Sequence, residues 1–460
     1  MHLPKTPNTP AVLQMLNWVV RPMPYMEECT KRYGDVFALK LDKKLPPIVF
    51  ISNPQDLQQV LSHDTKELEA PGDLNSLFEG LLGKRSLISL SGAEHQRQRQ
   101  LLMPPLHGER MRGYSETIND VTAQVISQYA VGQPFNIRTV SQAITLRVIM
   151  QAVFGLDKGV RAEKLQQLLG EILETGSSLW RVAALYFPAL QRDFGPIKVW
   201  GEQQQLQQQA DQLMYEEIQE RREHPDASRT DILSLLMDAR DTEGQPMTDQ
   251  ELRDELMTLL VAGHETTATG IAWAMYWIHK LPQVKEKLLQ ELDSLGDNPD
   301  ANTIFKLPYL TAVCSETLRI YPVGMLTFPR RVKTPITVGG YELPSGTPVM
   351  GSIYLTHQRE DLYPEPKQFK PERFLERQFS PYEYLPFGGG ARRCIGLAFA
   401  QWEMKLAIAQ ILTMRELDLA DHSEVKPQRR GLVTGPNRPI QMVVKSERFI
   451  KSRSLETTTV

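Results

Sequence analysis

The sequence predicts a mainly α-helical fold with small β-sheets, of the α+β class, and three observations support it. Helical periodicity of apolar residues dominates from about Ile118 to Leu295. Two alternating segments near the start, Val36 to Leu41 and Pro47 to Ile51, predict a pair of strands. Strand patterns return late in the chain, near Arg330 to Val338 and Pro348 to Ile353, followed by a Gly- and Pro-containing segment that predicts a hairpin, Arg430 to Val444.

The chain has 460 residues and 41% hydrophobic content, which is ample for a large core. Length alone favours about three domains. A helical body with small sheets early and late favours instead one domain over residues 1–460. Within it, residues 1–24 contain five prolines and are expected to form an N-terminal extension, and residues 446–460 are expected to form a flexible tail.

Charge and cysteine usage exclude several classes of protein. The net charge is −3 and the basic residues are spread along the chain, so no nucleic-acid partner is expected. Cys29, Cys314 and Cys394 are an odd, widely separated set, which argues against disulfides and for a reducing, cytoplasmic location. No run of 18 apolar residues exists, so no spanning helix is predicted, and the short apolar part Ala11 to Val20 leaves only weak peripheral membrane contact open.

One ten-residue stretch, Phe387 to Gly396, carries the strongest chemical signal. Cys394 follows three glycines and two arginines and stands at the start of an apolar helix, Leu397 to Leu412. Helix N-terminal N–H groups and nearby guanidinium groups favour a thiolate, and glycines let the backbone pass close to a large flat group. These features suit an axial thiolate on haem iron. A buried structural cysteine is the first alternative; a phosphate loop is the second, but its Gly-Lys-Ser/Thr ending is missing.

The stretch resembles the haem-binding loop of the cytochromes P-450, the haem-thiolate monooxygenases. Five residues fill that family's pattern without a miss: Phe387, Gly390, Arg392, Cys394 and Gly396. The resemblance covers about Lys31 to Val443. It implies a single triangular domain with a long central helix over the haem, haem b held by the Cys394 thiolate, and O₂ as co-substrate.

A second motif lies in a long predicted helix. Thr248 to Glu251 is a capping box, and no proline follows until Pro282, so a helix of about 30 residues, roughly 45 Å long, is predicted. In its middle, Gly263 disfavours the helix by about 1 kcal/mol relative to alanine. Thr266 and Thr267 can bond helix carbonyls and open the hydrogen-bond ladder locally.

The resemblance assigns roles to this segment, Ala262 to Thr267. It implies that Ala262 and Gly263 lie over the haem face, and that Glu265 and Thr266 are the acid and the alcohol that deliver protons to bound oxygen. The alternative is a buried helix whose Thr-Thr pair only packs. His264 receives no role.

Charged residues further along the chain predict a structural cluster. Glu316 and Arg319 are three apart in an apolar helix, which indicates a buried pair. The family has a further arginine that joins this pair, and Arg373 matches it. We interpret the three as a structural triad that shapes the loop around Cys394.

Haem carries two carboxylates, and the planar guanidinium of arginine suits them. His95 and Arg99 are four apart and share a helical face, at a spacing where the family often has Trp or His followed by Arg. His95 stands where Trp is the common residue of the family. The alternative interpretation of His95 is a residue on a solvated helix face. Arg330 and Arg392 complete the expected set of propionate ligands, with Arg331 open as an alternative to Arg330.

Electrons must come from another protein, since the sequence contains no flavin, nicotinamide or iron–sulfur module. The resemblance implies a ferredoxin or flavodoxin type donor, with its reductase, docking on the cysteine side of the haem. Candidate contacts are Arg393, Arg97, Arg110 and Arg112. A monomer is expected.

Apolar residues occupy the positions that face substrate in the family: Phe78, Leu82, Ala262, Val323, Leu326 and Leu432. A helix rich in apolar residues is also predicted between Leu165 and Leu190. Such a cavity suits a fatty acid, a terpenoid or a similar lipid-like molecule. Ordinary core packing explains these residues equally well.

The sequence therefore predicts a monooxygenase that places one oxygen atom in an apolar substrate. A haem-thiolate peroxygenase or isomerase that needs no reductase is the second interpretation, although such relatives often lack the acid–alcohol pair. A non-catalytic haem or lipid binder is the third. Reduction under carbon monoxide, and the dependence of turnover on an electron donor, distinguish the three.

Overall fold

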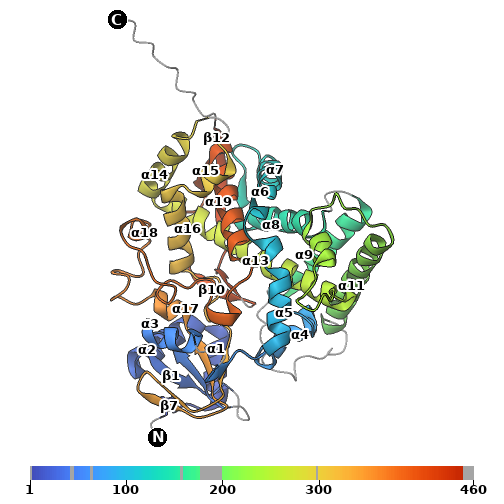
Figure 1. Ribbon diagram of the computed structural model, residues 1–460. Coiled ribbons are helices and arrows are strands. Elements are labelled where there is room, and N and C mark those ends of the chain that lie inside the picture. The colour runs from blue at the N-terminus through green and yellow to red at the C-terminus, as the bar shows by residue number, and fades with distance from the viewer. Residues whose placement is uncertain are drawn as a thin grey trace, which may run out of the picture.

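Helix α13 (Asp249–Lys280) runs through the middle of the molecule, with other helices packed around it (Figure 1). The structure is a computed structural model that describes residues 3–41, 46–62, 66–155, 159–176, 199–296, 299–431 and 433–448. The 32 residues of α13 confirm the long predicted helix. Because it crosses the interior, most of its side chains are buried, polar ones included.

The ends of α13 follow from local chemistry. The Glu251 N–H donates to Thr248 Oγ1 at 3.2 Å and the Thr248 N–H donates to the Glu251 carboxylate at 2.8 Å, which is the predicted capping box. The next helix begins at Pro282, where a missing N–H is tolerated in a first turn. The ladder is not opened at Thr266 and Thr267, because α-helical structure continues through both residues. Thr266 Oγ1 instead donates to the Ala262 carbonyl at 2.6 Å alongside the intact helix.

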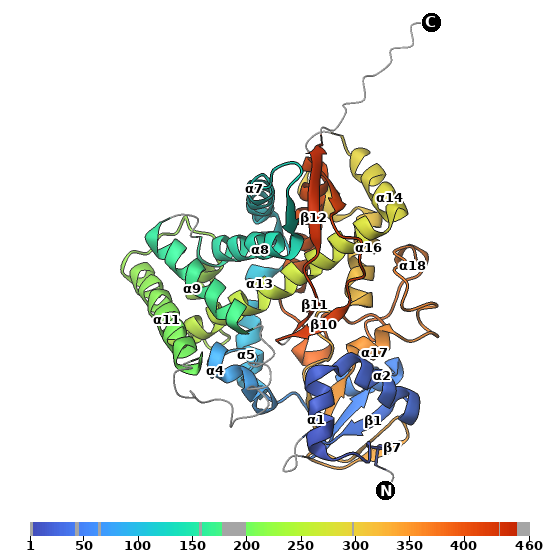
Figure 2. The ribbon, with the colours of Figure 1, turned by 180° about the vertical axis from the view of Figure 1, so that it is seen from behind.

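Longer helices pack around this central element. Helix α8 lies along α13, α16 and α19 also contact it, and α7 packs on α19 (Figure 2). On one side of α13, α9 and α11 pack together with α4 and α5 close by (Figure 1). The bounds are α4 Glu79–Leu82, α5 Gly92–Leu102, α6 Arg110–Gly113, α7 Ser115–Ile126, α8 Ile137–Phe154, α9 Val160–Gly176, α11 Val199–Glu223, α12 Ile232–Asp238, α14 Pro282–Asp293, α15 Ala301–Phe305, α16 Pro308–Ile320 and α19 Leu397–Met414.

A five-stranded sheet forms a separate β-rich lobe at the N-terminal end of the molecule (Figure 1). Its order is β1-β2-β8-β5-β3; the β2–β8 pair is parallel and the other pairs are antiparallel. The predicted pairing of the first two strands is confirmed. The bounds are β1 Val36–Leu39, β2 Ile48–Ile51, β3 Leu68–Glu69, β5 Arg330–Val332 and β8 Pro348–Gly351, with α1 Ala11–Val20, α2 Pro22–Tyr33, α3 Pro54–Ser62 and α17 Ile353–His357 beside them.

The predicted strand pattern from Arg330 to Val338 divides into two strands of different sheets. Residues Arg330–Val332 join the five-stranded sheet, whereas β6 (Ile336–Val338) pairs with β7 (Tyr341–Leu343). Pro335 stands between them, and a residue without a backbone N–H interrupts a ladder.

The late hairpin is confirmed. Strands β10 (Pro427–Arg430) and β11 (Val433–Pro436) pair antiparallel, and β11 contacts α13. Strand β12 (Gln441–Glu447) lies between β4 (Pro134–Asn136) and β9 (Arg415–Leu419). The expected flexible tail is wrong for Ser446 and Glu447, which belong to β12; residues 449–460 lie outside the described part.

Residues 3–24 are integrated into the fold more closely than the expected extension. Met15, Trp18 and Val19 of α1 are buried in a core cluster with residues of α2 and β1. The polar side chain of Gln14 is 2% exposed, and burial is tolerated because its amide donates to the Thr9 carbonyl and accepts the Lys40 N–H. None of the described helices is both long enough and apolar enough to cross a bilayer.

Candidate functional site

The loop before α19 holds Cys394 in a fixed turn. Gly388 and Gly390 adopt positive φ angles of 69° and 64°, which other residues rarely adopt. A Cβ on Gly389 would lie 2.8 Å from Leu61 Cδ1, so a glycine lets the loop lie against α3. The Cys394 N–H donates to the Phe387 carbonyl at 3.0 Å, which closes the loop.

Cys394 is exposed in the described structure, although many protein atoms surround it. Desolvation by these atoms raises the pKa of the Cys394 thiol, while hydrogen bonds from the Gly396 and Leu397 N–H groups and the charges of Arg99 and Arg393 lower it. The predicted anion-favouring groups are present, but desolvation outweighs them. An accessible thiol with donors aimed at its sulfur suits a site where a metal ion displaces the proton.

Cationic side chains converge near this loop. His95 of α5 is buried, and its pKa is lowered to about 3, first by burial and then by the charges of Arg392, Arg99 and Arg330. The three arginines are therefore close enough to one imidazole to keep it neutral. The structure thus brings together the four residues predicted to bind propionates.

Arg330 and Arg331 point to different surroundings. Arg330 is fully buried and donates to the Gly389 carbonyl at 2.9 Å and to the Phe328 carbonyl at 2.8 Å. Arg331 forms ion pairs with Glu69, at 3.0 Å, and Asp73. Because Arg330 is bonded to the Cys394 loop and Arg331 is paired with Glu69 and Asp73, the contacts favour Arg330 over Arg331 as the residue directed to that loop.

Arg392 ties the loop to the segment that precedes α5. Its guanidinium donates to the carbonyls of Leu87, at 2.8 Å, of Ala70, at 2.7 Å, and of Leu90. Some of the N–H groups of Arg392 that were predicted to bind a haem propionate therefore donate to backbone carbonyls instead. This tie holds α5, with His95 and Arg99, beside the cysteine.

On α13, Ala262 and Thr266 are one turn apart and both are accessible. Gly263 lies on another face, where an added Cβ would be 3.2 Å from Ile149 Cδ1 of α8. That Ala262 and Gly263 lie over the haem face stays a prediction. Ala262 shares an accessible face with Thr266, and the missing side chain of Gly263 allows close packing of α8.

Glu265 makes contacts that the sequence did not reveal. One carboxylate oxygen is ion-paired with Arg138 of α8, and the other accepts the Gln142 amide at 3.0 Å. One turn along, Thr145 Oγ1 lies 2.8 Å from His264 Nδ1. Burial is the main reason that the pKa of His264 is lowered to about 4. The signal was the spacing of Arg138, Gln142 and Thr145 at i, i+4 and i+7, which places them on one face of α8.

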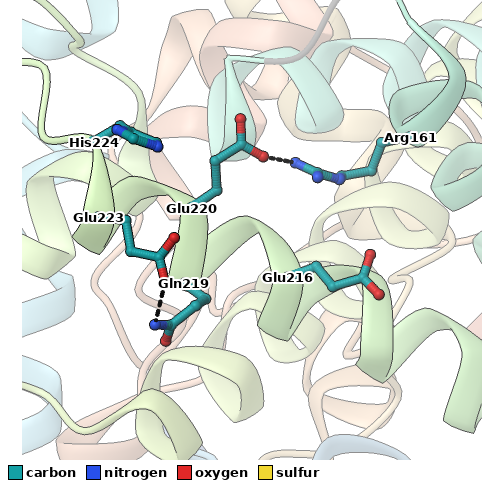
Figure 3. A pocket seen from close by; sticks show the side chains of 6 residues that line it. All are labelled: Arg161, Glu216, Gln219, Glu220, Glu223 and His224. Atoms are coloured by element: carbon teal, nitrogen blue, oxygen red, sulfur yellow. Dashed lines mark hydrogen bonds and ion pairs between the residues drawn. The ribbon is translucent and has the colours of Figure 1, made fainter.

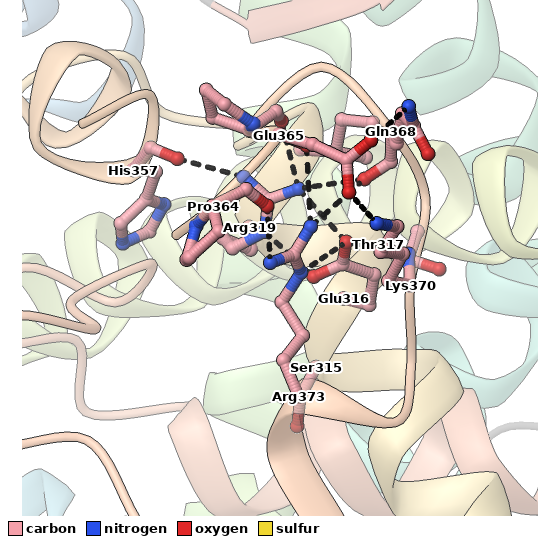
Figure 4. A network of polar contacts seen from close by, with 12 residues as sticks. Ser315, Glu316, Thr317, Arg319, His357, Pro364, Glu365, Gln368, Lys370 and Arg373 are labelled. Atoms are coloured by element: carbon pink, nitrogen blue, oxygen red, sulfur yellow. Dashed lines mark hydrogen bonds and ion pairs between the residues drawn. The ribbon is translucent and has the colours of Figure 1, made fainter. Parts of the chain in front are cut away.

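Figure 4 shows the predicted triad as a buried polar network. The Glu316 carboxylate accepts from Arg319 at 2.6 and 2.8 Å and from Arg373 Nε at 3.2 Å, and the side chains of Glu316 and Arg319 are 0% exposed. Arg319 also donates to the His357 carbonyl at 2.7 Å. His357 Nε2 accepts the Leu385 N–H at 3.0 Å, so the network is linked to the chain two residues before Phe387.

The predicted substrate residues have different environments. Phe78 packs against Phe328 with ring centroids 6.2 Å apart. Val323 is partly buried against the main core, and Leu326 against the cluster that contains α1. Leu82 is 2% exposed and belongs to the main core. Leu432 lies outside the described residues, as do residues 177–190 of the helix predicted between Leu165 and Leu190.

One further feature lies away from Cys394. Figure 3 shows a hollow beside α11 with mostly charged walls: Arg161, Glu216, Gln219, Glu220, Glu223 and His224. Its polar lining does not suit an apolar substrate, and it shares no residue with the site above. Within the described ranges, no three His, Cys, Asp or Glu side chains are grouped as a metal site.

The Cys394 site fits the expected haem on three counts. A single sulfur with donors aimed at it can serve as an axial ligand. A cluster of arginines can bind carboxylates. An accessible face of α13, with Ala262 and Thr266, offers a small and a hydroxyl side chain.

Comparisons with known proteins agree with these features. A family model for cytochrome P-450 matches residues 4–444. The putative cytochrome P-450 135B1 of Mycobacterium tuberculosis is 34% identical over 458 residues, covering 99% of this chain and 94% of that protein. The putative cytochrome P-450 135A1 of the same species is 33% identical over 437 residues, covering 94% of this chain and 93% of that protein.

Two solved structures share the fold. The retinoic acid bound cyanobacterial CYP120A1 superposes with a TM-score of 0.83 at 23% identity, covering 97% of this chain and 99% of that one. The heme domain of cytochrome P-450DA superposes with a TM-score of 0.85 at 22% identity, covering 98% and 99%. The predicted class, mainly helical with small sheets, is confirmed.

Proposed function

This chain belongs to the cytochrome P-450 family, and on that premise we propose that it oxidises an apolar, lipid-like substrate such as a fatty acid or a terpenoid. Members of the family are haem-thiolate monooxygenases, so the chain is an oxidoreductase that binds haem through a cysteine and uses O₂ as co-substrate. The proposal concerns the substrate class, the electron donor and the roles of individual residues.

We assign the haem contacts from the site geometry. Cys394 is the proposed thiolate ligand, and His95, Arg99, Arg330 and Arg392 are the proposed partners of the two propionates. Haem bound there supplies the oxygen-activating chemistry. The convergence of three arginines on one buried neutral imidazole supports this assignment, since guanidinium groups bind carboxylates bidentately.

The proposed proton route runs through Thr266 and Glu265. The Thr266 hydroxyl donates its hydrogen bond to the Ala262 carbonyl. Its oxygen lone pairs are therefore able to accept a further hydrogen bond. Glu265 is the adjacent residue, and its carboxylate is held by Arg138 and Gln142. A hydroxyl facing the accessible side of α13, with a carboxylate next to it, suits a relay that resupplies protons from outside.

The accessible Ala262–Thr266 face is the observation that carries the proposed substrate class. Phe78 and Val323 are among the apolar positions predicted to face substrate, and Phe78 packs against Phe328. The solved neighbour with retinoic acid bound shows that this fold can take an apolar acid.

The experiment is a spin-state titration of haem-loaded protein with fatty acids, terpenoids and steroids, followed by product analysis under heavy-isotope dioxygen. A low-to-high-spin change and one labelled oxygen in the product support the proposal. If none of these compounds changes the spin state, the lipid-like class is refuted.

We propose a separate ferredoxin or flavodoxin type donor that docks near Cys394. Arg393 and Arg110 are exposed and suit an acidic partner. Arg97 is a weaker candidate than predicted, because Asp241 and Glu251 neutralise it, the latter at 2.9 Å. Charge reversal at Arg393 is expected to slow reduction most at low salt; turnover with peroxide and no donor would favour the peroxygenase interpretation.

The three cysteines are unpaired thiols, which supports the proposed reducing, cytoplasmic location.

A further inference from the structure

His107 makes a hydrogen bond to the residue that follows the cysteine. Its Nε2 lies 3.0 Å from the carbonyl oxygen of Ile395. A carbonyl oxygen can only accept, so Nε2 carries the proton and donates it. The imidazole therefore holds one end of the peptide unit that joins Ile395 to Gly396.

The other end of that peptide unit faces the sulfur. A trans peptide is planar, and its C=O and N–H point in opposite directions. The N–H of this unit belongs to Gly396 and is hydrogen-bonded to Cys394 Sγ. Because the unit is rigid, the hydrogen bond from His107 fixes the direction in which the Gly396 N–H meets the sulfur.

The peptide unit that enters Cys394 is held in the same way. Arg99 Nη1 donates to the Arg393 carbonyl at 2.7 Å, and the N–H of that unit, which belongs to Cys394, donates to the Phe387 carbonyl at 3.0 Å. The peptide unit before Cys394 and the one after Ile395 thus both have a side chain on their carbonyl. Arg99 lies on α5, and His107 follows the short 3₁₀ turn η2 (Pro104–Leu106) just after it.

The backbone around His107 is well anchored. Pro105 and Leu106 of η2 are buried, and the His107 N–H donates to the Pro104 carbonyl. An imidazole on such a base can hold its partner within a narrow range of directions.

We propose that His107 is a positioning residue for the sulfur ligand: by holding the Ile395 carbonyl it sets the strength of the Gly396 N–H···S hydrogen bond and, through it, the reduction potential of the iron. The proposal rests on Cys394 as the iron ligand. An N–H donated to a thiolate withdraws electron density from the sulfur, and hydrogen bonds around the ligand are a recognised means of tuning haem iron. A weaker bond leaves more electron density for ferric iron and makes its reduction harder.

Three variants of the haem-loaded protein test this. His107→Phe keeps a planar ring without a donor, His107→Gln places an Nε2 donor the same number of bonds from Cβ, and His107→Asn has a donor that reaches less far. The measurements are the reduction potential, by spectroelectrochemical titration, and the iron–sulfur stretching frequency, by resonance Raman spectroscopy. We expect His107→Phe to lower the equilibrium constant for reduction about tenfold, which is about 59 mV for one electron, and to raise the stretching frequency.

We expect His107→Gln to remain near the native potential and His107→Asn to fall between. A native potential in His107→Phe, or an equal shift in His107→Gln and His107→Phe, would overturn the proposal, because the donor would then not be the cause. If His107→Phe does not retain haem, the order of the reduction potentials of the Gln and Asn variants tests the proposal. Failure of the premise that Cys394 ligates the iron gives a separate result: the native protein, reduced under carbon monoxide, would lack the red-shifted Soret band of a thiolate-ligated haem.

Discussion

The Arg138 guanidinium of α8 is ion-paired with the Glu265 carboxylate of α13, and Gln142 occupies the second carboxylate oxygen. Both oxygens of the proposed acid are thus directed to α8, while the hydroxyl of the adjacent Thr266 is bonded within its own helix. The packing of α8 on α13 therefore fixes the position of the Glu265 carboxylate. Because Glu265 and Thr266 have different partners, a substitution can change the acid and leave the hydrogen bond of the alcohol in place.

Replacing the acid without changing its shape is expected to interrupt proton delivery. We predict that Glu265→Gln lowers product formation roughly 10²-fold, the lower range for loss of a general acid. Electrons from the donor should then be used without forming product, so the measurement is product formed per electron pair consumed.

Gln142→Leu is the matched control, because it removes the neutral partner of Glu265 and keeps both the carboxylate and Arg138. It should stay close to native coupling. If Glu265→Gln itself retained native coupling, another group would have to be the acid.

Truncating the buried triad is expected to destabilise the fold strongly. Arg319→Leu leaves the fully buried Glu316 carboxylate without its bidentate partner, a change that costs about 3–5 kcal/mol. Urea unfolding of the haem-loaded protein, followed by the loss of the Soret band, measures it.

An exposed ion pair provides the comparison. Lys287 and Glu372 lie 2.8 Å apart with side chains 53% and 37% exposed, and Lys287→Ala should cost less than about 1 kcal/mol. Equal losses in the two variants would show that burial of the triad has no energetic consequence.

Motifs with local chemistry could be read from the sequence, whereas contacts between distant segments could not. The capping box at Thr248 and the glycine turn before Cys394 depend on neighbouring residues, and both lie where the sequence predicts them. The partners of Glu265 come from a helix more than a hundred residues earlier, and only packing of α8 on α13 brings them together. For the same reason the sequence could not tell which face Gly263 occupies.

Gly72 is predicted to tolerate no side chain. A Cβ there would lie 1.8 Å from the Ser89 carbonyl oxygen, a backbone atom that cannot rotate away. The Leu90 carbonyl next in the chain accepts from Arg392, so displacement of this segment would reach the cationic cluster. We expect Gly72→Ala to destabilise the protein by more than about 3 kcal/mol and to weaken haem retention, measured by transfer of haem to an apoprotein acceptor.

Gly80 is the control for Gly72, since an added Cβ meets nothing within 4 Å and its φ is not positive. Gly80→Ala lies in the short helix α4 and should be neutral or stabilising by about 0.4–1 kcal/mol. A Gly72→Ala variant as stable as Gly80→Ala would mean that the segment before α5 can move without cost.

Acidification is expected to destabilise the protein through His357. This residue is fully buried, and burial, followed by the charge of Arg319, lowers its pKa from the ordinary 6.5 to about 3. Its Nε2 must be unprotonated to accept the Leu385 N–H. Between those pH values the unfolded chain binds a proton that the folded protein does not, so stability falls by about 1.4 kcal/mol per pH unit below 6.5 and is unaffected above it.

His357→Gln separates this contribution from those of other buried histidines, because a Gln carbonyl can still accept the Leu385 N–H without titrating. Urea midpoints measured from about pH 7 to about pH 5 should fall less steeply in this variant than in the native protein, by roughly the slope of one group. Parallel curves for the native protein and His357→Gln would mean that His357 takes up its proton in the folded state, and that the Leu385 contact does not depend on a neutral ring.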